Sequence, residues 1–124
     1  MKKTLSVLIL AVTAGLLLAS TNHYGIVTVT TAGVPVQIAP AISSTEANCL
    51  QVIVTADPAN TGTLYVGMDN TVSSSRYFAA LQVNGSFNSG PSGSSPRFPC
   101  QSLWVDGSVN GTKADVLILT GNSN

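Results

Sequence analysis

The two cysteines are the residues best suited to covalent chemistry. Cys49 and Cys100 each stand at the start of a predicted β-strand. An even number of cysteines in an exported protein favours a disulfide, and closing a loop of about 50 residues would stabilise the fold by about 4 kcal/mol. A pair of buried thiols is the alternative, because free cysteine often serves as a small core residue. The sequence favours the disulfide, and a pair of buried thiols remains the alternative.

The other reactive side chains are few and scattered. His23 is the only histidine, and no nucleophile or orienting partner neighbours it as a catalytic histidine would require. Zinc needs about four ligands, which two distant cysteines and one histidine do not supply. The acidic residues stand singly, mostly in or beside predicted turns, where Asp usually bonds its own backbone. A carboxylate pair or a calcium site assembled from distant residues stays open. We expect no enzyme, no catalytic residues, no metal site and no cofactor.

Charge argues against nucleic acid as a partner. Charged residues make up 8% of the chain, against about 25% in an average soluble domain, while 44% of the residues are hydrophobic. Beyond Lys2 and Lys3, three basic residues remain against five acidic ones, a net charge of 3 − 5 = −2. No basic cluster occurs among them. Because neutralisation of phosphates by Lys and Arg dominates nucleic-acid affinity, we expect no direct binding to DNA or RNA.

Residues 1–24 have the form of a bacterial signal peptide or a membrane-anchor helix. Lys2 and Lys3 precede an apolar run from Leu5 to Ala19. That run is shorter than the roughly 20 residues that span a bilayer, which favours a signal peptide. Cleavage after Ala19 or Ser20 would place a leucine where a small residue is preferred, which favours a retained anchor. In both cases the domain faces outward. The leucines expected in the membrane are Leu5, Leu8, Leu10, Leu16 and Leu18.

Residues 25–124 carry the alternation of apolar and polar side chains that is typical of β-strands. Turn sequences rich in Gly, Pro and Asn separate the strands, and no amphipathic helical stretch interrupts them. We therefore expect an all-β fold: a single small β-sandwich or jelly-roll-like barrel, preceded by the N-terminal hydrophobic helix. Pro35 places its strand at a sheet edge. The predicted strands are 26–31, 34–38, 49–55, 63–68, 77–83, 101–105 and 115–120.

A long loop, 84–99, is the candidate contact surface. It is rich in Gly, Ser and Pro, and loops of this length are often functional. Phe87 and Phe98 lie in it, with Arg97 beside Phe98, and an exposed aromatic ring there could anchor a partner. A packed loop is the alternative. Tyr65, Tyr77, Phe78 and Trp104 lie within predicted strands, and we expect most of them in the core.

Two stretches of the chain are similar to each other. Residues 49–57 resemble residues 100–106, and each stretch is followed by a turn with an Asn and a Gly-Thr pair. Two halves of one sandwich could pair these two strands with each other.

Three stretches of this sequence resemble a group of small bacteriophage virion proteins. They are VTVTTAGVPVQ at 27–37, CLQVIVTADPANTGTLYVG at 49–67 and LWVDGSVNG at 103–111. The resemblance implies a compact β-domain in the virion, on the capsid or near a vertex or tail. It also implies other virion proteins as partners, in a homo-oligomer or a larger assembly. The hydrophobic leader and the Ser/Gly/Pro insertion at 88–96 depart from that group.

Two functions follow as hypotheses. The first is a structural virion protein, such as a minor capsid, vertex or decoration subunit, whose leader would hold a membrane while its β-domain holds the shell. The alternative is a secreted or periplasmic binding or adhesion module that uses the loop 84–99. Gene neighbours would discriminate them, because virion genes would accompany the first and a secretion or attachment operon the second.

Overall fold

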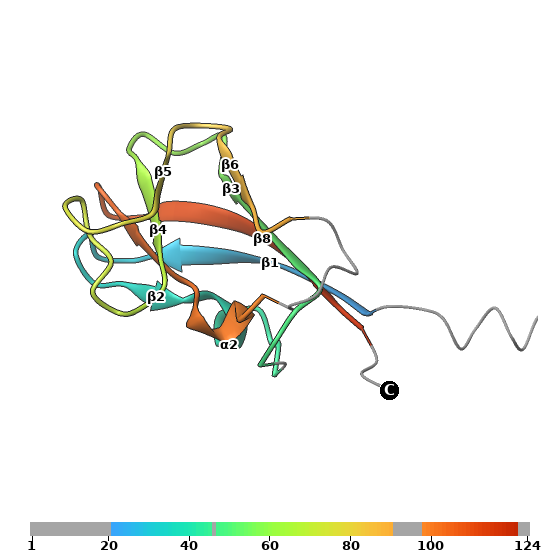
Figure 1. Ribbon diagram of the computed structural model, residues 1–124. Coiled ribbons are helices and arrows are strands. Elements are labelled where there is room, and N and C mark those ends of the chain that lie inside the picture. Colours follow the sequence, from blue (N-terminus) through green and yellow to red (C-terminus); the bar gives the residue numbers. More distant parts are fainter. Residues whose placement is uncertain (1–20, 46, 91–97, 122–124) are drawn as a thin grey trace, which may run out of the picture.

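The structure is a computed structural model that describes residues 21–45, 47–90 and 98–121 (Figure 1). The N-terminal helix predicted for the leader, with its five leucines, and Arg97 of the predicted contact loop lie outside these residues. Within the three described ranges, no helix has the length and apolar character to cross a membrane.

Two antiparallel four-stranded sheets make up the domain. The first sheet has the order β1-β8-β3-β6, and the second has the order β2-β7-β4-β5 (Figure 1). Two short helical turns, α2 (Ile38–Ala41) and η1 (Cys100–Ser102), lie outside the sheets. The strands of the first sheet are β1 (Thr21–Val29), β8 (Thr112–Thr120), β3 (Gln51–Ala56) and β6 (Ser86–Asn88). Those of the second sheet are β2 (Val36–Gln37), β7 (Trp104–Gly107), β4 (Leu64–Gly67) and β5 (Ala79–Leu81).

Strand pairing follows a simple rule along the chain. The first strand pairs with the eighth, the second with the seventh, the third with the sixth and the fourth with the fifth. Two further pairings, β3 with β8 and β4 with β7, join these pairs into the two sheets. All six pairings are antiparallel. The first four are nested, as in one long hairpin whose two arms run through both sheets.

The core lies between the sheets because side chains alternate along each strand. In β3 the pattern of exposure alternates strictly, and Val52, Val54 and Ala56 are fully buried. The second sheet contributes Leu64 and Val66 from β4 and further buried residues from β5 and β7 to the same hydrophobic cluster. The prediction of an all-β fold is therefore confirmed, with two antiparallel sheets around one core.

Several boundaries differ from those predicted. β1 begins at Thr21, so the division expected after Tyr24 falls inside a strand, in which His23 pairs with Ile118 of β8. The strand expected at 34–38 is reduced to the two residues of β2, since α2 begins at Ile38. β2 does lie at a sheet edge, as Pro35 predicted.

The similarity between residues 49–57 and 100–106 does not reflect paired strands. β3 lies in the first sheet and β7 in the second, so the proposed pairing is wrong. The turns after the two strands do meet, because Thr63 N–H donates to Ser108 Oγ at 2.8 Å. Asn60 reaches the start of β8, donating to the Lys113 carbonyl at 2.7 Å and accepting from its N–H at 2.8 Å.

Candidate functional site

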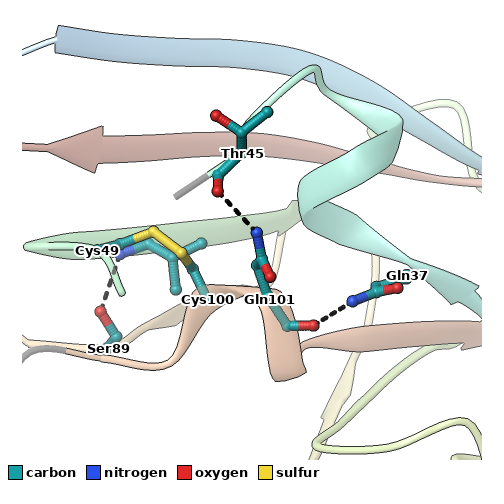
Figure 2. The surroundings of a disulfide bond; sticks show 7 residues. Gln37, Thr45, Cys49, Ser89, Cys100 and Gln101 are labelled. Carbon is teal, nitrogen blue, oxygen red and sulfur yellow. Dashed lines mark hydrogen bonds between the residues drawn. A yellow bond between two sulfur atoms is a disulfide. The ribbon is translucent and has the colours of Figure 1, made fainter. Parts of the chain in front are cut away.

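The predicted disulfide joins the two sheets. Cys49 and Cys100 are both fully buried, with their Cα atoms 5.6 Å apart (Figure 2). Cys49 leads into β3 of the first sheet, and Cys100 begins η1, which leads into β7 of the second. Cys49 also exchanges two backbone hydrogen bonds with Phe98, at 2.7 and 3.0 Å. The bond is thus a buried covalent tie, with no exposed sulfur for exchange chemistry.

Glutamine side chains hold the segments around this disulfide. Gln101 donates through its side-chain amide to the Thr45 carbonyl at 2.9 Å, and the Gln37 amide donates to the Gln101 carbonyl (Figure 2). On the other side, the hydroxyl of Ser89 accepts from the Val52 N–H at 2.9 Å. These hydrogen bonds connect the chain segments that flank the disulfide, so this end of the domain serves to hold the fold together.

Two aromatic residues of the predicted contact loop, Phe87 and Phe98, lie against the core. Phe87 belongs to β6 and lies opposite the core residue Val54, so its ring points inward. Both Phe87 and Phe98 are partly buried and pack against the core, with ring centroids 6.1 Å apart. Phe87 also meets Phe78 edge to face, with centroids 4.9 Å apart. The expectation that Phe87 and Phe98 contact a partner stays a prediction, since the structure shows them chiefly as packing residues.

Other aromatic residues are exposed where the sequence predicted core. Tyr77 is 49% and Phe78 44% exposed, in the connection between β4 and β5. The strand predicted at 77–83 is confined to β5, which is why these two rings fall outside the sheet. Tyr77 stacks on Tyr65 with centroids 5.3 Å apart. Together with Met68 and Val72, the two exposed rings line an open hollow of about 220 Å³.

An ion pair borders this hollow. Arg76 approaches Asp69 at 3.4 Å, and both side chains are more than half exposed. Hydrogen bonds from the Thr71 hydroxyl and from its backbone N–H lower the pKa of Asp69, with a smaller contribution from Arg76. The carboxylate is therefore fixed in an Asx turn, as expected of Asp in turns. Apolar rings beside a fixed charge pair are a surface that a polar ligand with an apolar face could use.

The outer face of the first sheet is apolar in its middle. Tyr24 and Ile26 of β1 are 68% and 53% exposed. Tyr24 lies beside Leu117 of β8, which in turn lies beside Ile53 of β3, and both of these neighbours are half-buried. We call these four residues, together with Leu119, the outer apolar face. Its composition suits contact with another protein surface better than contact with a small polar ligand.

A carboxylate lies at the border of the outer apolar face. Asp115 of β8 is flanked in the sheet by Ile26 and Thr55, and its Oδ1 atom is buried without a hydrogen-bond partner. Burial raises the pKa of Asp115, the nearby Asp57 carboxylate raises it further, and Lys113 partly offsets both effects.

Asp106 is buried but serves the fold. Only 2% of the residue is exposed, and its Oδ1 accepts from the N–H groups of Gly33 at 2.9 Å and Gly107 at 2.8 Å. Gly33 lies in the turn between β1 and β2 and has φ +84°, a left-handed conformation that glycine adopts without strain. Through its hydrogen bond to Gly33, the Asp106 carboxylate holds this turn against β7. Asp106 therefore holds backbone in place and is not positioned as an isolated reactive group.

Nowhere in the described part of the chain do three or more His, Cys, Asp or Glu side chains gather as metal ligands would. Scans against protein-family models, curated proteins and solved structures found no significant match to this chain.

Proposed function

We propose that this domain is an eight-stranded jelly roll that serves as a structural subunit of a bacteriophage virion, in a minor capsid, vertex or decoration position. The strand pairing carries the proposal. Nested antiparallel pairing of first with eighth, second with seventh, third with sixth and fourth with fifth strand is what two superposed Greek keys produce. Viral capsid subunits are among the proteins built on this architecture, with lectin domains and cupins.

Surface composition supports an assembly role. Fold alone decides no function, so the surface has to supply the rest of the argument. The domain combines few charges with the outer apolar face, and such a face suits packing among neighbouring subunits. The resemblance of residues 27–37, 49–67 and 103–111 to small phage virion proteins points the same way.

The N-terminal segment extends this proposal to a membrane. An apolar helix over the leader would either export the domain or hold it to a lipid layer. In a phage with an internal membrane, a subunit of this kind would hold the lipid with its N-terminus and the shell with its β-domain.

Co-sedimentation tests the proposal. Phage particles from the producing culture would be separated on a density gradient, and peptides of this chain would be quantified in every fraction. We expect the peptides to follow the major shell protein through the particle band at a constant ratio. Peptides confined to envelope or soluble fractions would contradict a virion role.

The alternative is an exported module that binds carbohydrate. Jelly rolls also form lectins, and the hollow beside Tyr77 and Phe78, with its Asp69–Arg76 ion pair, is the observation that favours this function. Aromatic rings would contact the apolar face of a sugar while the charged pair bonds its hydroxyls. Titration with oligosaccharides tests this alternative: it requires binding that is lost in Tyr77→Ala and kept in Val109→Ala, a substitution at another exposed apolar residue.

A further inference from the structure

The edges of the two sheets differ in how they are protected. The outermost strands are β1 and β6 in the first sheet and β2 and β5 in the second. Short length is a common protection against edge-to-edge pairing, and β5 and β6 have three residues each. β2 has two residues and follows Pro35, which cannot donate a hydrogen bond. Three of the four edges are therefore blunted.

β1 lacks these protections. It has nine residues, Thr21–Val29, with no proline, lysine or other formally charged side chain. Val29 accepts a hydrogen bond from Gly111 N–H at 2.8 Å, so its carbonyl faces β8. Because hydrogen bonding alternates along an antiparallel strand, the backbone groups of Asn22, Tyr24, Ile26 and Thr28 face away from β8. No strand among the described residues pairs with this side of β1, so these groups form a row of donors and acceptors along the sheet edge.

The side chains on this row are apolar at its centre. Tyr24 and Ile26 are the most exposed large hydrophobic residues of the first sheet. They are the part of the outer apolar face that lies at the edge of the sheet. Gly25 lies between them, and its inner side is closely covered by Ile42 of the same chain. The centre of the edge is therefore apolar on its outer face and tightly packed on its inner face.

We propose that β1 pairs with β1 of a second copy of this chain, antiparallel and about a two-fold axis at Gly25. In this register Tyr24 lies opposite Ile26 of the other copy and Asn22 opposite Thr28, so all nine residues find a partner. An aromatic residue opposite a β-branched one is a favourable cross-strand pair. Continuous pairing would join two four-stranded sheets into one of eight strands and double the outer apolar face.

The absence of charge favours a second copy over a different partner. A two-fold interface brings the residues at its axis near their own copies, so a charge at the centre of the strand would repel its counterpart in the other copy. β1 carries no formal charge, and with the axis at Gly25 the smallest residue lies where the two backbones approach most closely. This inference goes beyond the virion proposal and stands without it, since a dimer of this kind would serve an exported module equally well.

Register-specific cross-linking tests the pairing. Asn22→Cys and Thr28→Cys would be made as separate variants of the full chain, both at exposed positions. Opposite residues of an antiparallel pair lie within disulfide reach, whereas two copies of the same substitution would lie about 20 Å apart. We expect mild oxidation to give a disulfide-linked dimer from a mixture of the two variants and from neither variant alone. Failure of the mixture to cross-link, or equal cross-linking of the single variants, would overturn the proposal.

A charge substitution tests the interface by a second route. Tyr24→Lys places an ammonium group beside Leu117 near the centre of the dimer, and Val109→Lys places one at an exposed turn as the matched control. Since burying like charges opposes association, we expect Tyr24→Lys to weaken dimerisation by about tenfold or more in sedimentation experiments. Val109→Lys should match the unsubstituted chain, and far-UV circular dichroism should be unchanged in both variants. A monomeric unsubstituted chain, or a dimer indifferent to Tyr24→Lys, would refute pairing through β1.

Discussion

Removal of the disulfide should cost this domain a large part of its stability. The bond between Cys49 and Cys100 closes a loop with a sequence separation of 51 residues. In the chain-entropy model, a loop of this length lowers the entropy of the unfolded chain by about 14 cal/mol/K, which corresponds to about 4 kcal/mol at 25 °C. A domain of this size has a total free energy of unfolding of about 5–15 kcal/mol, so the loss would remove roughly a quarter to four-fifths of it.

The assay is equilibrium unfolding of the unsubstituted chain and of the double variant Cys49→Ala/Cys100→Ala. We expect the free energy of unfolding in guanidinium chloride to fall by about 4 kcal/mol, mainly as a lower midpoint concentration. Because both cysteines are fully buried, part of any further loss would come from the sulfur atoms removed from the core.

The reduced, unsubstituted chain serves as the control, since it keeps both sulfur atoms and loses only the bond. Its free energy of unfolding should be close to that of the double variant. A loss below about 1 kcal/mol in the reduced chain would refute the reasoning from loop length. Two reactive thiols in the chain as isolated, measured in denaturant without reductant, would refute the disulfide itself.

Three further substitutions test the packing and the electrostatics of the fold by urea unfolding. Leu103→Ala removes a fully buried side chain and should lower the free energy of unfolding by about 3 kcal/mol; a loss below 1 kcal/mol would contradict its place in the core. Gly107→Ala should cost about 1–3 kcal/mol, because a Cβ there would lie 2.5 Å from the Thr112 side chain, and an unchanged midpoint would contradict that contact. Asp115→Asn should stabilise the fold at pH 7 by up to about 1 kcal/mol. The pKa of Asp115 is raised above 3.8, so the stability that its protonated form contributes is present below that pH and is lost as pH rises through the folded-state value. The gain should therefore vanish near pH 3, and a gain independent of pH would contradict the assignment.

Local pattern is enough to predict the class of fold and most of the longer strands. The alternation in residues 51–56 and 114–118 reflects burial on one face of a sheet, and the buried residues are those that the alternation predicts. The even number of cysteines, together with the expectation of export, favours a disulfide, and the structure contains the Cys49–Cys100 bond. Pro35 correctly marked a sheet edge, because its missing donor is a local property.

Pairing and surface could not be predicted in the same way, because they depend on contacts between distant residues. The similarity of residues 49–57 and 100–106 suggested paired strands, yet β3 and β7 lie in different sheets, since a strand pattern does not encode its partner. The sequence predicts a loop where β6 lies, because a three-residue strand after an Asn-Gly turn is too short to show an alternating pattern. The sequence predicts Tyr77 and Phe78 in the core, and both are exposed because β5 begins only at Ala79.

Intact mass spectrometry of the chain, taken from purified phage particles and from the cell envelope and medium of the same culture, tests the central proposal most directly. A virion subunit predicts the chain within particles, with a mass that rises by two hydrogen atoms on reduction of the Cys49–Cys100 bond. A mass near 12.7 kDa there would also assign the leader to the mature subunit as its membrane anchor. A chain shortened by its leader, present in the medium or periplasm and missing from particles, would contradict the virion proposal and favour the exported binding module.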